Sequence, residues 1–326
     1  MNSVLRIGTR DSQLAVWQAS LVKNELAKHN IKSELVFIKT EGDIDLVTPL
    51  YEIGVQGIFT KTLDAALLSN RIDIAVHSMK DVPTQLAKGI SQTAVLPRAS
   101  YKDILVYKGE WSVVSSELGF INDQWSITHS SQLITHSSPF TIATSSIRRR
   151  AQWLHRYPDH TIENLRGNVN TRLKKVEEHN WNGAIFAAAG LERIHLRPQN
   201  SIELDWMLPA PAQGAIMIAC RTEDDKTKEA CNKLNDEATA LCTKIERDFL
   251  RTLMGGCSTP ISALALVKNN VVYFKGNIFS LDGKEHVEIE KKIEIENAFS
   301  LGVEAGNEVL LNGGKKIMEA IRNAGK

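Results

Sequence analysis

The stretch DIAVHSMKDVPT (73–84) contains an apolar segment that passes directly into a polar turn. Its first part has the length of a buried strand, and residues 77–81 follow at the carboxyl end of that strand. Two further strands, at 4–8 and 35–38, precede it with helices between them, and this alternation predicts an α/β unit with a largely parallel sheet. Ligands bind beyond the carboxyl ends of such strands, so 9–12 and 77–81 are candidate binding segments.

A second unit with the same alternation begins with a predicted strand at 140–143. The Thr-Ser-Ser segment 144–146 is positioned to cap a helix, and a strand of small residues is predicted at 184–188. Segment 208–214 has the composition of a return linker, after which a strand at 215–220 would rejoin the first sheet.

The C-terminal part of the chain has a different pattern. An amphipathic helix is predicted over 238–253, followed by three strands with turns at Asn269-Asn270 and Asp282-Gly283 and by two closing helices. The fold class expected is therefore α/β, with two lobes and a small α+β C-terminal domain. The expected boundaries are 1–100 with 215–234 for the first domain, 101–214 for the second, and 235–326 for the third.

Residues 108–140 are rich in Ser and Thr and repeat ITHSS at 127–131 and 134–138. Such a composition is typical of a solvated surface insertion, and we assign it no role.

Composition excludes several classes of protein. The chain has 326 residues, of which 43% are apolar and 24% charged, and its formal net charge is +1. Nucleic-acid binding through bulk charge would require a basic excess, and no apolar run is long enough to span a membrane. The N-terminus lacks a secretory signal, and the four cysteines form no C-x-x-C pair, so neither a disulfide framework nor a zinc site is indicated. A reducing cytoplasm is the simplest location.

Arginines are concentrated at the predicted starts of helices and ends of strands. A guanidinium pairs with a carboxylate or phosphate through two parallel hydrogen bonds, so this placement indicates a ligand with several negative charges. An isolated run such as 148–150 is more often a solvated helix face, but the further arginines at loop ends weigh against that interpretation. The group comprises Arg10, Arg148, Arg149, Arg166, Arg172 and Arg193.

Two other positions carry reactive groups. Lys80 and Asp81 form either an ordinary ion pair or, at a strand end, a site for general acid catalysis and stabilisation of a cation. Cys257 follows two glycines, which allow the backbone to bring its thiol close to a ligand, so it is a candidate nucleophile or attachment point. The other cysteines, Cys220, Cys231 and Cys242, are better explained as packing residues.

Seven stretches occur in one order over nearly the whole chain outside 108–140. They are LRIGTRDSQLA (5–15), DIAVHSMKDVPT (73–84), TSSIRRRAQ (144–152), LRGNVNTRL (165–173), AAAGLERI (187–194), PAQGA (211–215) and GGCSTPI (255–261). Together they resemble the motifs of the hydroxymethylbilane synthase, or porphobilinogen deaminase, family.

The resemblance implies a transferase of tetrapyrrole and haem biosynthesis, whose first two domains are similar to type II periplasmic-binding-protein lobes. Such an enzyme joins four porphobilinogen molecules head to tail with release of ammonia, and then hydrolyses off the linear tetrapyrrole. It also implies one dipyrromethane cofactor per chain, bound to Cys257 through a thioether, and no metal. We expect a cytoplasmic monomer whose partner is the small molecule porphobilinogen, without nucleic acid or membrane.

The resemblance assigns roles residue by residue. Asp81 would be the catalytic carboxylate, which hydrogen-bonds the pyrrole N–H, stabilises the azafulvenium-like cation left by departing ammonia, and helps to move protons. Each pyrrole carries an acetate and a propionate, which the arginines would hold. The expected cofactor-binding residues are Cys257, Lys80, Ser78, Thr144, Ser145, Ser146, Arg148, Arg149, Arg166 and Gln213. The expected substrate-binding residues are Arg10, Ser12, Arg149, Arg172 and Arg193.

The chain departs from the family pattern at three motif positions. Gln56 replaces a lysine, although Lys61 is retained, and this puts a lysine contact at Gln56 in doubt. Ala143 and Ala212 each replace a glycine, and neither change affects Asp81 or Cys257.

Two other functions fit part of this pattern. A solute-binding protein or the effector lobe of a regulator would explain the arginines. Such a protein does not need a third domain with Gly-Gly-Cys, however, and the sequence shows no export signal. A phosphate-ester enzyme would explain arginines at helix starts, but the sequence contains no P-loop or G-x-G-x-x-G motif.

Overall fold

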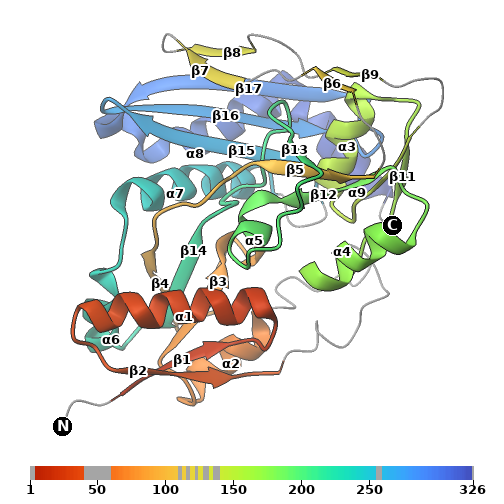
Figure 1. Cartoon of the computed structure of the whole chain (residues 1–326). Helices are drawn as coiled ribbons and strands as arrows, with labels where there is room; N and C mark the ends of the chain where they lie inside the picture. The colour runs from red at the N-terminus through yellow and green to blue at the C-terminus, as the bar shows by residue number, and fades with distance from the viewer. Residues whose placement is uncertain are drawn as a thin grey trace.

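Three sheets of three or more strands organise the part of the chain that the structure describes (Figure 1). The computed structural model describes residues 4–39, 60–108, 140–254 and 259–324, together with the backbone of four short strands between 112 and 134. In the view of Figure 1 the first lobe lies at the bottom, the second lobe above it to the right, and the third sheet at the top. No helix within these described ranges is long and apolar enough to cross a lipid bilayer.

The first lobe is a five-stranded sheet of order β2-β1-β3-β14-β4. Strands β1, β2 and β3 are parallel, whereas β14 is antiparallel to both of its neighbours. Two buried clusters pack on this sheet, one containing Val22 and Leu26 of α1 and the other containing Leu63 and Leu67 of α2. The strand predicted at 215–220 therefore does rejoin the first sheet. The elements are β1 (Leu5–Thr9), α1 (Gln13–Lys28), β2 (Ser33–Phe37), α2 (Lys61–Leu68), β3 (Ile74–Ser78), β4 (Ile90–Val95), β14 (Ile216–Arg221) and α6 (Asp225–Asn232).

The second lobe repeats the same plan, with strand order β11-β10-β12-β5-β13. In both sheets the fourth strand is antiparallel to the third and is the strand that the chain enters after crossing from the other lobe. Both lobes thus share one mainly parallel plan with helices between the strands, so the α/β expectation is confirmed. The elements are β5 (Asp103–Tyr107), β10 (Thr141–Ala143), α3 (Ile147–Arg156), β11 (Thr161–Glu163), α4 (Val169–Glu178), β12 (Gly183–Ala187), α5 (Ala188–Glu192) and β13 (Ser201–Glu203).

The third unit is an antiparallel sheet of order β15-β16-β17 with helices packed on it. Its core contains Phe249 from α7 and Phe274 from β16, whose rings meet edge to face 5.2 Å apart between centroids. This is the α+β unit that the sequence predicts. The elements are α7 (Glu237–Thr252), β15 (Ile261–Lys268), β16 (Val271–Phe279), β17 (His286–Glu294), a 3-10 segment (Ile295–Ser300), α8 (Leu301–Val309), a π-helical turn (Leu310–Gly314) and α9 (Lys315–Ala324).

The predicted insertion contains four short strands that the sequence did not indicate. Strands β6 (Ser112–Val114) and β9 (Gln132–Ile134) pair with each other, as do β7 (Leu118–Ile121) and β8 (Gln124–Ile127). Each strand has only three or four residues, which is too few for an alternating pattern to be visible in the sequence.

The two crossovers between the lobes run side by side. A Cβ added to Gly214 would lie 2.6 Å from the carbonyl oxygen of Ala99, so only glycine allows this approach. Arg98 on the first crossover pairs with Glu246 of α7 through two hydrogen bonds of 2.6 and 3.0 Å. The buried Glu246 carboxylate also accepts bonds from the N–H groups of Ala212 and Ala265 at 2.6 and 2.8 Å. Glu246 thus joins both crossovers to the third unit.

Removing this charge should destabilise the protein strongly. We expect Glu246→Gln to lower the free energy of unfolding by about 3–5 kcal/mol, because the buried Arg98 guanidinium loses its counter-charge. Urea unfolding followed by circular dichroism measures the change. Glu178→Gln is the matched control, because Glu178 pairs with Lys174 on the surface of α4 and its side chain is 53% exposed. Equal midpoints for the two variants would contradict the prediction.

Candidate active site

The turn after β3 presents Lys80 and Asp81. Residues Met79–Asp81 form a 3-10 turn, and the buried side chain of Met79 fixes it to the core of the first lobe. The Met79 N–H donates to the carbonyl of Ala215 at 3.0 Å, while the Ser78 hydroxyl accepts a 2.8 Å bond from Gln18 of α1. These contacts hold the start of the turn in place, and Lys80 and Asp81 are therefore held together at the carboxyl end of β3.

Lys80 reaches from the first lobe toward the second. Its Nζ donates to Oε1 of Gln213 at 3.2 Å, and Gln213 Nε2 in turn donates to Oδ1 of Asp103 at 2.9 Å. Burial lowers the pKa of Lys80 to about 8, although the negative charge of Asp81 opposes this shift. The amine consequently loses its proton far more easily than an exposed lysine does.

Asp103 is the central acceptor of the site, and our sequence analysis missed it. This fully buried carboxylate accepts bonds from Arg148 Nη2 at 2.7 Å and from Arg149 Nε and Nη2 at 3.1 and 2.8 Å. Burial opposes ionisation of Asp103, but the charges of Arg148, Arg149 and Lys80 outweigh it and hold the pKa of the carboxyl below its usual range. A charged residue directly before the apolar run ILVY (104–107) was the available signal.

Arg148 and Arg149 are buried, so the solvated-face interpretation is wrong for them, whereas Arg150 is exposed. Arg148 also donates to the carbonyl of Leu208 at 2.7 Å, and Arg149 to that of Ile185 at 2.9 Å. A guanidinium has five N–H donors, and these bonds use only some of them. Each side chain therefore has N–H groups that these bonds do not use.

The three hydroxyl residues before α3 shape the turn that holds these arginines. Ser146 is the helix cap, and its hydroxyl accepts a 3.4 Å bond from the Arg149 N–H. Thr144 Oγ1 accepts from the Ser146 N–H at 3.2 Å, while the Ser145 hydroxyl bonds both backbone groups of Leu165. Each hydroxyl thus has a partner within the protein.

Other predicted arginines surround this centre at different positions. Arg172 Nε donates to the carbonyl of Gly167 at 2.7 Å, and burial together with the charges of Arg149 and Arg166 lowers the pKa of Arg172 to about 10. The negative charge of Asp81 opposes that shift, which shows that Asp81 and Arg172 lie within electrostatic reach of one another. Arg166 is itself buried.

Arg10 and Ser12 belong to the segment that follows β1. Burial and the positive charge of Arg10 lower the pKa of His77 to about 4, so His77 is neutral at physiological pH. Ser12 occupies the cap position of α1 without a capping bond from its side chain.

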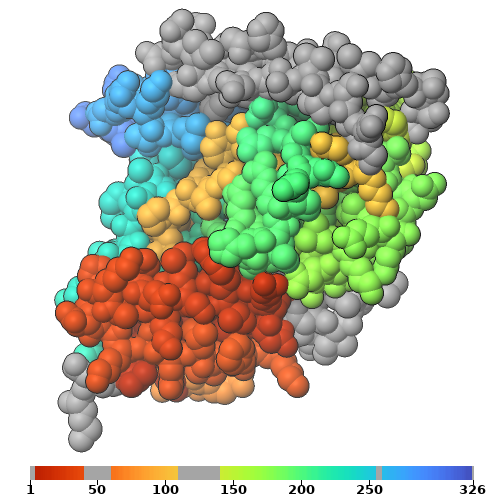
Figure 2. Space-filling view, viewed as in Figure 1, coloured from red at the N-terminus to blue at the C-terminus, as the bar shows by residue number. Residues whose placement is uncertain are grey.

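Arg193 lies at the contact between the lobes. Its Nη2 donates to the carbonyl of Gly214 at 2.6 Å, and its guanidinium lies over the ring of Trp17 on α1, 5.8 Å from the centroid. Figure 2 shows the first lobe, in red, meeting the green segment of the second lobe on this face.

Several predicted positions lie outside the described residues, namely Gln56, Cys257 with the two glycines before it, and the side chains of the insertion. The other three cysteines are buried packing residues, as predicted, and burial raises the pKa of Cys231 and Cys242 to about 12. Ala212 adopts a φ of +62°, a conformation that glycine takes without steric cost, and its burial shows that the fold accommodates the methyl group.

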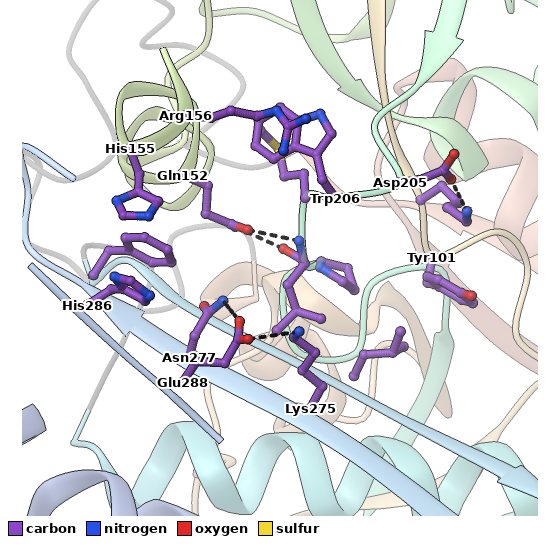
Figure 3. A pocket seen from close by; sticks show the side chains of 16 residues that line it. Tyr101, Gln152, His155, Arg156, Asp205, Trp206, Lys275, Asn277, His286 and Glu288 are labelled. Carbon is purple, nitrogen blue, oxygen red and sulfur yellow. Dashed lines mark hydrogen bonds and ion pairs between the residues drawn. The ribbon is translucent and has the colours of Figure 1, made fainter. Parts of the chain in front are cut away.

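A cavity of about 370 Å³ lies elsewhere, between α3, the segment 205–209 and the third sheet (Figure 3). His155 and His286 line one side of it, and Asn277 and Lys275 contact Glu288 on the floor. None of the predicted site residues that the structure describes lines this cavity. The candidate site is therefore identified by its charges and contacts.

The side chains of the site fit an acidic ligand. Lys80, Arg148, Arg149, Arg166 and Arg172 act electrostatically on one another or on Asp81 and Asp103. Cationic side chains from both lobes are thus gathered around Asp81 and Asp103. A bis-pyrrole with acetate and propionate substituents would present carboxylates to these cationic groups. No group of three or more His, Cys, Asp or Glu side chains arranged to hold a metal ion occurs in the described part of the chain.

The chain is similar to known proteins over nearly its whole length. Residues 5–229 match the model of the porphobilinogen deaminase dipyromethane cofactor binding domain, and 240–311 match that of the porphobilinogen deaminase C-terminal domain. Porphobilinogen deaminases from Chloroherpeton thalassium and Chlorobium phaeobacteroides are each 38% identical over 99% of this chain and 99% of their own. Among solved structures, an ancestral cationic amino acid solute binding protein has a TM-score of 0.41 and 13% identity over 71% of this chain and 87% of its own. The matches in sequence span both lobes and the third unit, and the chain belongs to the porphobilinogen deaminase family.

Proposed function

We propose that this enzyme is a hydroxymethylbilane synthase that joins four porphobilinogen molecules head to tail, releases ammonia at each step and hydrolyses off the linear tetrapyrrole. The observation that carries the proposal is the connected network Lys80–Gln213–Asp103–Arg148/Arg149 beside Asp81. This network gathers the cationic side chains of Lys80, Arg148 and Arg149 near the Asp81 carboxylate, which suits the condensation of acidic pyrroles.

In this proposal Asp81 is the catalytic residue. Its carboxylate accepts a hydrogen bond from the pyrrole N–H of porphobilinogen and stabilises the positive charge that develops on the ring as ammonia departs. The same carboxylate then takes up or returns a proton as the new bond between rings forms.

The cationic cluster is proposed to hold the dipyrromethane cofactor. When bound, this group supplies the nucleophilic pyrrole carbon to which new rings are added. Cys257 would anchor it covalently, and the surrounding side chains would orient its carboxylates and ring N–H groups. The proposed set is Ser78, Lys80, Thr144, Ser145, Ser146, Arg148, Arg149, Arg166 and Gln213.

Incoming porphobilinogen is proposed to bind Arg10, Ser12, Arg149, Arg172 and Arg193 through its acetate and propionate. We further propose a cytoplasmic monomer that binds neither nucleic acid nor membrane. The proposed domains are 1–100 with 215–234, 101–214, and 235–326. The pairing of β14 with β3 supports assigning the segment after the second crossover to the first domain.

Turnover distinguishes this function from simple binding of an anionic solute. We expect the purified protein to release one ammonia per porphobilinogen consumed and to form a linear tetrapyrrole that mass spectrometry detects. Saturable binding of porphobilinogen without its consumption would instead support a solute-binding protein.

The charge state of Lys80 should appear in the pH dependence of cofactor assembly. Burial lowers the pKa of this amine to about 8, so its positive charge is present below that pH and is lost above it. Carboxylates bind the charged form of the Lys80 amine. We therefore expect cofactor-free protein to assemble its cofactor more slowly as the pH rises through 8. Lys80→Arg keeps its charge to much higher pH, so the fall in the rate of cofactor assembly should move to higher pH in this variant. If the rate of cofactor assembly falls at the same pH in Lys80→Arg as in the wild type, Lys80 does not have this role.

A further inference from the structure

Arg247 of helix α7 forms hydrogen bonds with the backbone of the turn that carries Lys80 and Asp81. Arg247 Nη1 donates to the carbonyls of Met79 and Val82 at 3.3 and 2.9 Å, and Nη2 donates to the carbonyl of Pro83 at 2.6 Å. These three carbonyls lie on both sides of the Lys80-Asp81 pair in the chain. One guanidinium from the third unit therefore fixes the backbone on either side of the catalytic carboxylate.

The part of α7 that carries Arg247 is itself held in place by neighbouring segments. Glu246, the residue before Arg247, is fully buried and joins α7 to both crossovers. Burial lowers the pKa of Arg247 to about 10, which still leaves the guanidinium charged at neutral pH. Helix α7 ends at Thr252, and the chain reaches Cys257 shortly afterwards. The helix that leads to the cofactor-attachment cysteine is thus the helix that holds the turn of Asp81.

We propose that Arg247 is a positioning residue for the reaction, which holds the Lys80-Asp81 turn at a fixed place relative to α7. The proposal rests on the proposed function, because it assigns Arg247 a role through Asp81. A carboxylate displaced by about 1 Å from its working position loses about 10²-fold in rate. The loss should fall on kcat, because the interaction with Asp81 strengthens in the transition state while the substrate carboxylates are held by other residues.

The test replaces Arg247 in the cofactor-loaded enzyme. Arg247→Met keeps the apolar stem but removes the three hydrogen bonds, and we expect kcat to fall about 10- to 100-fold with KM within about 2-fold of wild type. Intact mass should show the cofactor still bound. Arg247→Lys, which keeps a charged donor, should recover part of the lost kcat. Arg251→Met is the matched control, because Arg251 lies one turn further along α7, pairs with Asp248 and has a 59% exposed side chain. It should retain the wild-type kcat.

Two results would overturn the proposal. One is a loaded Arg247→Met enzyme with wild-type kcat. The other is a loss of activity that matches the loss of folded protein and is equally large in Arg247→Lys, which would make Arg247 a stabilising contact alone. Failure of the proposed function is recognised separately, because the wild-type protein would then release no ammonia from porphobilinogen.

Discussion

Asp81→Asn is expected to retain the cofactor but to lose nearly all turnover, with kcat falling about 10²- to 10⁴-fold. The amide has almost the same shape as the carboxylate, so the turn held by Met79 and Arg247 should persist. It carries no negative charge, however, and can neither stabilise a cationic pyrrole nor accept a proton. Loss of both contributions accounts for the size of the effect.

The measurement is ammonia release from saturating porphobilinogen by protein whose loaded state has been verified by mass. Asp159→Asn makes the same chemical change at an exposed position and should leave kcat unaltered. Turnover close to that of the wild type in Asp81→Asn would remove this residue from the mechanism.

Asp103→Asn should destabilise the fold strongly. Asparagine keeps the size of the side chain but leaves Arg148 and Arg149 buried without a counter-charge, which we expect to cost about 3–5 kcal/mol of unfolding free energy. The folded-state pKa of Asp103 is below its ordinary value, so its stabilising contribution is present at neutral pH. That contribution is lost progressively as the pH falls below about 4, where the unfolded carboxyl becomes protonated.

Urea midpoints at several pH values test this prediction. The difference between wild type and Asp103→Asn should be largest near pH 7 and should shrink in acid. Asp225→Asn is the control, because the Asp225 side chain is 93% exposed and pairs with Lys228 on its own helix. A pH-independent difference would show that the charge of Asp103 is not the cause.

The sequence was sufficient to predict the α/β lobes, the return of the chain to the first sheet and the C-terminal α+β unit. These features depend on hydrophobic periodicity and chain order, which are local signals. The Lys80-Asp81 turn and the arginines were also located, because polar residues at strand ends can be recognised from the order of residues along the chain. Their individual partners were not predicted.

Asp103 shows why the partners were missed. It begins β5, and its register opposite Ala187 of β12 becomes known only when the sheet is assembled. The bonds from Gln213, Arg148 and Arg149 to this residue span 45 to 110 positions of sequence. Arg247 was missed for the same reason, since its acceptors are backbone carbonyls more than 160 residues away.

The intact mass of the purified protein tests the central claim most directly. We predict a mass that exceeds the sequence mass by two porphobilinogen units less two ammonia molecules, and we predict that Cys257→Ser removes this excess together with the activity. A fully active protein whose mass equals that of its sequence would contradict the account.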